Sequence, residues 1–273
     1  MDARLITLIT DFGNEDAYVA QMKGQMFSIC PSAKLLDITH AIAAQDIDQA
    51  GLVLYQAAPY FPAGTIHLVI VDPGVGTERR MLALEMDLPC EQDQPWRRQR
   101  FVLPDNGLIG PLLDIGHNAV INVLTERRFW RSHISSTFHG RDIMGPVAAH
   151  WASGIDRDQF GPRADGIEKR SWPQPVLQGQ EARGQILTLD HFGNALTNVP
   201  GVWLEARRRD DLTVSVAGRV VPFQQTSTYG EKPDKTPVLL VGSHQLVELA
   251  IVKGDAGREL DLSPGDEVII RVN

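Results

Sequence analysis

The feature that most constrains this chain is a continuous apolar run, IHLVIV at residues 66–71, which ends directly at Asp72. The run is short, rich in β-branched residues and bounded by Gly64 and Pro73, and this combination predicts a buried strand. In open α/β sheets, ligands bind at the carboxyl ends of the strands. Asp72 is therefore well placed to meet a ligand.

The turn after this strand supplies further polar groups. Glycines at positions 74 and 76 allow the backbone to approach a ligand closely, and Arg79 and Arg80 follow in the same loop. Taken alone, the run is equally compatible with an aspartate that caps a turn and two solvated arginines.

A second polar cluster lies in TFHGRDIMGPVAAHWASG, residues 137–154. His139, Arg141 and Asp142 fall within four positions. The apolar spacing that follows predicts a helix, with Asp142 as a candidate N-terminal cap and Gly154 as its stop. A lone histidine is more often structural, but neighbours such as these can fix its tautomer and charge.

The amino terminus repeats the pattern of a strand that ends at an aspartate. The run LITLITDFG, residues 5–13, ends its apolar stretch at Asp11, and Asp16 follows the glycine turn. Three polar clusters in one half of the chain predict a site there, although no single cluster would.

Composition sets the class of protein. The chain has 273 residues, of which 43% are hydrophobic and 22% charged, the balance of an ordinary protein with a full core. The net charge of -8 argues against a nucleic-acid partner. Two short basic clusters, at 96–100 and 207–210, lie in polar surroundings and are expected to be solvated.

Two cysteines, Cys30 and Cys90, make neither a disulfide framework nor a metal set, so a reduced setting is expected. The first apolar run is too short for a signal peptide, and no segment approaches the roughly 20 apolar residues of a membrane span. We therefore expect a cytoplasmic protein with no membrane association.

The order of patterns predicts two domains. Strand-like and helix-like segments alternate in the first half, which predicts an α/β domain with a mostly parallel sheet. Strands are expected at 5–10, 35–40, 66–71, 81–86 and 101–107, helices at 17–28 and 46–60, and an exposed loop at 87–100.

After a proline-containing stretch the pattern changes to short strands separated by turn residues, which predicts a small β-barrel or sandwich. The expected organisation is an α/β domain at 1–170, a linker at 171–182 and a β-barrel domain at 183–273.

Taken together, five spaced motifs resemble the S-adenosylmethionine hydroxide adenosyltransferases, the hydrolytic relatives of the halogenating S-adenosylmethionine enzymes. The motifs are TDFG with Asp16, VDPGVGTERR, LPDNG, FHGRD and DHFGNALTN, and the resemblance runs from Leu5 to about Gly254. It implies an α/β domain, a β-barrel domain and a homotrimer whose active sites lie between subunits. It also implies that S-adenosylmethionine is the substrate and that no cofactor or metal is needed.

The reaction implied is attack of water on the ribose 5′ carbon, which releases methionine and adenosine. Methionine is a neutral leaving group, so the difficulty lies with water, whose pKa is about 15.7. A positioned cation and a base can help. By motif, the hydrolytic residues fall on Asp72, Arg79 and His139. Which of them accepts the proton is left open.

The resemblance also assigns substrate-holding residues. Asp11 would accept hydrogen bonds from the ribose hydroxyls, and Asp16 would contact the methionine end. Asp190 and Asn194 would bind the amino and carboxylate groups of methionine, and Phe192 would face the adenine or ribose. The alternative is that FGN is only a turn and Phe192 only a core residue. Methionine and adenine would also meet three later residues, Ser243, Glu248 and Val252.

Three alternatives are open. A halogenase would share the fold and substrate but carries a serine in its halide pocket where this chain has Gly145. A metal-dependent phosphoesterase could use Asp11, Asp16, His40 and Asp72 as hard ligands, although no HxD or DxD pair has strand-end spacing. A nucleoside-binding module without catalysis is the third alternative.

Overall fold

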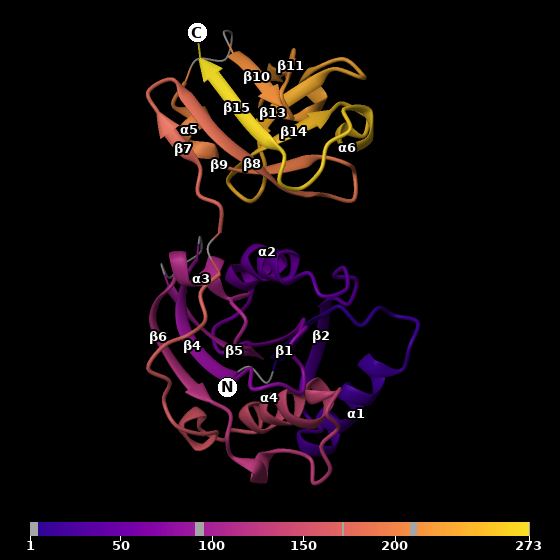
Figure 1. The fold of residues 1–273 in the computed structure, drawn as a ribbon, viewed down its shortest axis with the longest axis vertical. Coiled ribbons are helices and arrows are strands. Elements are labelled where there is room, and N and C mark those ends of the chain that lie inside the picture. The colour runs from indigo at the N-terminus through magenta and orange to yellow at the C-terminus, as the bar shows by residue number, and fades with distance from the viewer. Residues whose placement is uncertain (1–4, 91–95, 171, 208–211, 273) are drawn as a thin grey trace. The chain divides into compact units, whose positions relative to one another are not determined.

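The computed structural model describes residues 5–90, 96–170, 172–207 and 212–272. It divides into two compact units, one up to Trp172 and one from Pro173. Each unit has its own sheet and its own buried core. The two sheets are described separately below (Figure 1).

The sheet of the first unit has the strand order β2-β1-β3-β5-β4-β6. Its neighbours pair in parallel from β2 to β5, whereas β4 is antiparallel to both β5 and β6. Five strands therefore run in one direction, which confirms the parallel-rich α/β prediction. The strands are β1 (Leu5–Thr10), β2 (Lys34–Thr39), β3 (Ile66–Ile70), β4 (Met81–Pro89), β5 (Trp96–Pro104) and β6 (His117–Val123).

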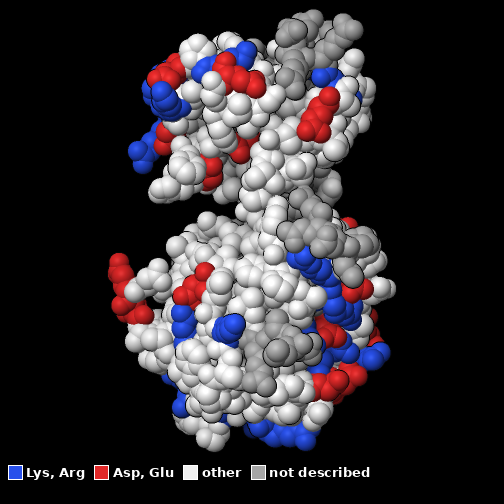
Figure 2. Space-filling model, turned by 180° about the vertical axis from the view of Figure 1, so that it is seen from behind, with Lys and Arg blue, Asp and Glu red and all other residues white. Residues whose placement is uncertain are grey.

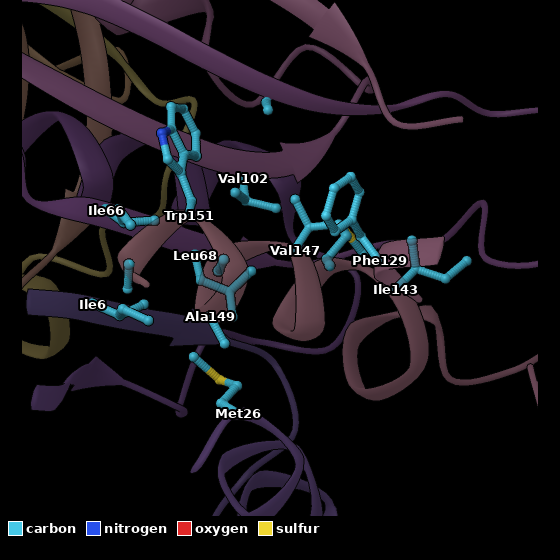
Figure 3. Close-up of a cluster of buried hydrophobic side chains, with 14 of the residues drawn as sticks. Ile6, Met26, Ile66, Leu68, Val102, Phe129, Ile143, Val147, Ala149 and Trp151 are labelled. Carbon is cyan, nitrogen blue, oxygen red and sulfur yellow. The ribbon is translucent and has the colours of Figure 1, made fainter. Parts of the chain in front are cut away.

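Helices cover both faces of this sheet, as Figure 1 shows. Alternate side chains of a strand point to opposite faces, so Ile6 and Leu8 enter one apolar cluster and Ile9 enters another. The helices are α1 (Tyr18–Ile29) and α4 (Gly145–Ala152) on the first face and α2 (Ile47–Ala57) and α3 (Gly110–Ile115) on the second. Figure 3 shows Val147 and Trp151 of α4 beside Leu68 and Val102 of the sheet.

Two predictions about the first unit are wrong. The loop expected at 87–100 is largely strand, because β4 and β5 pair from Met81–Pro104 to Pro89–Trp96. The basic cluster at 96–100 is therefore part of a sheet, and Gln99 is fully buried, where it donates to the carbonyl of Phe61 at 2.8 Å. Pairing between β4 and β5 satisfies the backbone hydrogen bonds of this polar segment. The segment lacks the apolar alternation from which a strand is predicted.

Asp142 is not the cap of a helix. It lies inside a π-helical turn, Gly140–Met144, which runs directly into α4. Its fully buried carboxylate accepts from Arg131, Arg141 and the backbone of Ser135 instead. Gly154 follows the helix with a φ of +102°, as expected of a stop.

Several residues between β6 and β8 (Glu181–Leu189) are packed or paired. Phe160 is buried in the first core, and Asn122 forms an isolated bridge with Arg163. Further on, β7 (Val176–Gln178) pairs with the start of β8 in the second unit. Proline and glycine break helical and strand periodicity here without preventing packing.

The second unit is built on one sheet of nine strands, in the order β11-β10-β15-β8-β9-β14-β13-β12 with β7 beside β8. One core takes Val214 and Ile270 from one side of β8 and Leu239 and Leu249 from the other, so the sheet curls around it. Among the described residues no pairing joins β11 to β12, and a closed barrel stays a prediction. The other elements are β9 (Ala195–Pro200), α5 (Gly201–Glu205), β10 (Leu212–Val216), β11 (Arg219–Val221), β12 (Gln224–Gln225), β13 (Pro237–Val241), β14 (Leu246–Ile251), α6 (Ala256–Glu259) and β15 (Glu267–Val272).

Charged side chains of both signs are interspersed on the face of each unit that Figure 2 draws. Of the second basic cluster, only Arg207 is described, and it donates to the carbonyls of Trp203 and Gly179. The rest of that cluster, 208–210, lies outside the described residues. Within the described ranges, every helix is too short or too polar to cross a membrane.

Candidate active site

Three aspartates leave the sheet of the first unit at the same edge. β1 and β3 are parallel and in register from Ile6 and Ile66 to Thr10 and Ile70, so Asp11 and Asp72 follow neighbouring strand ends. β5 is parallel to β3 as well and ends just before Asp105. The carboxyl ends of parallel strands therefore gather the polar groups that the sequence places far apart.

Asp72 forms a two-point ion pair with Arg79. The Nε of Arg79 donates to Oδ1 at 2.9 Å, and its Nη2 donates to Oδ2 in a second, shorter bond. The two side chains are only 5% and 8% exposed. Burial raises the pKa of Asp72 above its ordinary value, while the charge and hydrogen bonds of Arg79 oppose this. The remaining nitrogen, Nη1, donates to the carbonyl of Arg80, so the guanidinium is fixed in orientation.

The neighbouring arginine has a different partner. Arg80 donates from Nε to Asp105 at 2.7 Å and from Nη2 to the carbonyl of Gly166 at 2.9 Å. Asp105 also accepts from the backbone of Glu168. Arg80 thus ties the strand-end loop to the segment that follows α4, whereas Arg79 stays on Asp72.

His139 immediately precedes the π-helical turn and lies within electrostatic range of this pair. Its pKa is lowered, first by burial and then by the charge of Arg79, while Asp72 and Asp142 act in the opposite direction. The Nδ1 atom is buried and has no hydrogen-bond partner among the described residues. The first unit therefore brings together the three residues that the motifs single out, Asp72, Arg79 and His139.

A glycine permits this approach. A Cβ on Gly76 would lie 2.4 Å from the carbonyl oxygen of Ser136, and Gly76 has a φ of +79°. Gly76 precedes Arg79 by three positions, and Ser136 precedes His139 by three. The Arg79 loop and the His139 loop therefore touch at a point where only glycine fits.

The predicted ribose ligand, Asp11, is half-buried, and its Oδ2 accepts from the backbone N–H of Gln45 at 2.8 Å. Gln45 adopts a φ of +67° to direct this N–H. Asp16 is exposed in the segment before α1, and no described group bonds its carboxylate. An aromatic cluster that sequence reasoning missed, Phe12, Tyr18 and Phe138, joins these segments to the His139 loop, with ring centroids 5.3 to 6.1 Å apart.

In the second unit, Asp190 and Asn194 form one turn. Asp190 accepts from the backbone of Phe192 and Asn194, both at 2.8 Å, and from the side-chain amide of Asn194 at 3.0 Å. Phe192 is 72% exposed and so is not a core residue. The turn therefore presents an aromatic ring at the surface of this unit.

Glu248 is 9% exposed and accepts a hydrogen bond from the hydroxyl of Tyr229. Burial, with a smaller contribution from the charge of Asp190, raises the pKa of Glu248. Burial and the same hydrogen bond raise the pKa of Tyr229 well above its ordinary value, so this hydroxyl stays protonated and is a donor. Sequence reasoning missed Tyr229, because no motif marks its loop.

The two remaining predicted contacts differ in accessibility. Ser243 is exposed and lines a cavity of about 380 Å³ with Gln225, Ser227 and Gln245. Val252 is buried, and its backbone N–H and carbonyl are already bonded to Thr236 and Lys235.

The structure bears on two of the alternatives. A Cβ on Gly145 would lie 2.8 Å from the carbonyl oxygen of Gly140, so a serine there would force the backbone to move. Of the hard ligands that a phosphoesterase needs, Asp72 is engaged by Arg79 and His40 by Thr10 and Asp37. No group of three or more His, Cys, Asp or Glu side chains within the described ranges could hold a metal ion.

The chain is similar to known proteins along nearly its whole length. Residues 6–161 match the SAM hydroxide adenosyltransferase N-terminal domain, and residues 184–269 match the SAM hydroxide adenosyltransferase C-terminal domain. A protein named (R)-S-adenosyl-L-methionine hydrolase from Thermus thermophilus is 36% identical over 96% of this chain and 97% of its own. A protein of the same name from Salinispora arenicola is 34% identical, with 96% of each chain covered.

Other relatives agree in fold or lie further away. A solved structure of an uncharacterized conserved protein from Thermotoga maritima aligns with a TM-score of 0.88 at 32% identity and covers 97% of this chain and 99% of that one. A fluorinase from an Actinoplanes species is 26% identical over 74% of this chain and 73% of its own. On the match of both domains and of the full-length relatives, this chain belongs to the SAM hydroxide adenosyltransferase family.

Proposed function

We propose that this protein hydrolyses S-adenosyl-L-methionine to adenosine and L-methionine. The observation that carries the proposal is the buried Asp72–Arg79 pair with His139 beside it, in a chain whose full-length relatives are named as hydrolases of this substrate. The supporting geometry lies entirely within the first unit.

In the proposed reaction, a water oxygen bonds to the ribose 5′ carbon as the bond from that carbon to sulfur breaks. The electron pair of the broken bond goes to sulfur, which changes from a sulfonium cation to the neutral thioether of methionine. The attacking water must lose a proton. Arg79 stays cationic and oriented by Asp72, so it can stabilise developing hydroxide by a preorganised positive charge.

We assign proton acceptance to His139. Both oxygens of Asp72 are occupied by Arg79, so the imidazole of His139 is the better placed base of the two. The lowered pKa of His139 keeps its imidazole neutral near pH 7, the form that can accept a proton. A positioned group of this kind contributes about 10²- to 10⁴-fold to a rate.

Substrate holding is assigned by chemistry. Asp11 has one oxygen on Gln45 and the other for ribose hydroxyls. Asp16 would meet the cationic methionine end. In the second unit, the carboxylates of Asp190 and Glu248, the amide of Asn194, the hydroxyl of Ser243 and the ring of Phe192 are proposed contacts to methionine and adenine. A contact from Val252 stays a prediction, since its polar groups are already bonded.

A single assay tests the function. The protein is incubated separately with the R and S sulfonium diastereomers of S-adenosyl-L-methionine, and the products are separated by chromatography. We expect adenosine and methionine, and the relatives' names favour the R form. Chloride and fluoride are added in parallel incubations. A 5′-halogenated adenosine in place of adenosine would support the halogenase, and binding without any product would support the nucleoside-binding module.

We also propose a homotrimer in which residues of both units serve each site, on the resemblance to the family. Light scattering gives the assembly state. A mixture of inactive His139→Ala and Asn194→Ala proteins should regain activity after subunit exchange if sites combine residues from two chains. No rescue after verified exchange would mean that each chain builds its own site. A cytoplasmic location is proposed on composition alone.

A further inference from the structure

A chain of four polar side chains runs behind the turn that carries Asp11. The Nζ of Lys23 lies 2.6 Å from Oδ2 of Asp37. Oδ1 of Asp37 lies 3.0 Å from Nε2 of His40, and Nδ1 of His40 lies 2.8 Å from Oγ1 of Thr10. The series begins at the surface with Lys23 and Asp37, whose side chains are 26% and 42% exposed, and ends at Thr10, which is fully buried.

The chemistry of these groups gives the direction of each contact for a neutral His40. An ionised carboxylate can only accept, so Nε2 of His40, which faces Oδ1 of Asp37 at 3.0 Å, is the nitrogen that carries the proton. In the neutral imidazole, Nδ1 is then the acceptor, and the hydroxyl of Thr10 must donate to it. The lone pairs of that hydroxyl face the turn, where the backbone N–H of Phe12 donates to it at 3.3 Å.

The backbone of His40 holds the same turn from its other end. Its carbonyl accepts from the N–H of Gly13 at 2.8 Å, and Gly13 adopts a φ of +67°. His40 therefore forms hydrogen bonds on both sides of Asp11, from its side chain to Thr10 and from its carbonyl to Gly13. Gln45, whose N–H holds Oδ2 of Asp11, lies in the loop that begins at His40.

We infer that Thr10, His40 and Asp37 are positioning residues that orient the Asp11 carboxylate toward the ribose hydroxyls of the ligand. None of the three touches the ligand; each acts through the turn. The inference deepens the proposed function, on which it rests. A site held within about 0.5 Å by supporting hydrogen bonds binds better than one left loose.

The test measures binding of adenosine and of 2′,3′-dideoxyadenosine by titration calorimetry, and so needs no turnover. Thr10→Val removes the hydroxyl at nearly constant shape, and Thr10→Ser keeps it. We expect Thr10→Val to weaken the binding of adenosine about tenfold, the equivalent of about 1.4 kcal/mol, and to leave the affinity for dideoxyadenosine unchanged. Thr10→Ser should behave like the wild type. A purely structural role would weaken both ligands equally.

Two further comparisons keep the inference open to refutation. Asp37→Ala, at the exposed end of the chain, should repeat the loss even if Thr10→Val folds poorly, while Lys34→Ala on the same strand is the matched control. In an Asp11→Ala background, Thr10→Val should add nothing. Equal losses for both nucleosides, or a full additional loss without Asp11, would overturn the inference.

Failure of the proposed function would look different. One outcome is that Thr10→Val weakens the binding of adenosine alone, while the wild-type protein releases no adenosine from S-adenosyl-L-methionine. This would refute hydrolysis and support the positioning role of Thr10, His40 and Asp37. Another outcome is that the protein hydrolyses the substrate and Thr10→Val binds both nucleosides as the wild type does. This would support the proposed function and refute the positioning role. Hydrolysis by a wild type that fails to distinguish the nucleosides would also refute it.

Discussion

Replacing Gly76 with alanine should separate the two loops that bring Arg79 and His139 together. The added Cβ would lie 2.4 Å from the carbonyl oxygen of Ser136, whereas ordinary contact begins at 3.4 Å. The loops must therefore part by about 1 Å. Both are tied internally, through Thr77 to Gly74 and through Ser135 to Asp142, so the movement is passed on to the reactive side chains.

The expected loss is mainly one of rate. A displacement of about 1 Å between reacting groups can cost about 10²-fold, so kcat should fall by about that factor. KM should change little, because Asp11 and its supports lie on other segments. Stability should fall by the strain of a positive φ, about 1–2 kcal/mol, plus about 1–3 kcal/mol for the overpacked contact.

Gly64 supplies a matched control. It has the same φ of +79°, but a Cβ there would meet nothing within 4 Å. Gly64→Ala should therefore show the φ strain alone, with kcat unchanged. The assay is steady-state release of adenosine for both variants, with thermal unfolding in parallel. A Gly76→Ala enzyme with kcat within twofold of Gly64→Ala would refute the argument from the loop contact.

Three other predictions follow from the same site. Arg79→Met leaves the buried carboxylate of Asp72 without its cation and should lower the free energy of unfolding by about 3–5 kcal/mol. Combining Asp72→Asn with Arg79→Met should recover most of that loss, and urea unfolding at fixed protein concentration measures both variants. Equal losses in the single and the double variant would contradict the argument from the buried ion pair. The pKa of His139 is lowered below 6.5 and its neutral form is the proposed base, so kcat should stay constant down to pH 6.5 and fall only at lower pH. A fall in kcat that begins above pH 6.5, or one that persists in His139→Gln, would count against this role. Turnover should survive exhaustive chelation, since Arg79 supplies the positive charge, and restoration by Mg²⁺ or Zn²⁺ after loss with EDTA would revive the metal-dependent alternative.

Much of the fold could be predicted from local patterns. The strand 66–71 appears as β3 with one residue less, and the helix 46–60 appears as α2 followed by a 3-10 turn at Ala58–Tyr60. The spacing of apolar residues predicts these elements, because strands and helices each place apolar side chains at a characteristic period along the sequence. The β4–β5 hairpin could not be found this way, since its polar arm gains stability from pairing across strands.

The sequence by itself determined which residues are candidates for chemistry and at which strand ends they lie. Motif spacing singled out Arg79, but only the fold creates the different partners of the two arginines, Asp72 for Arg79 and Asp105 for Arg80. The sequence could not assign Asp142 to the support of the His139 loop, or His40 to the support of Asp11. The role of His40 depends on a contact across 30 residues and that of Asp142 on an irregular helical turn, and only packing in three dimensions creates them.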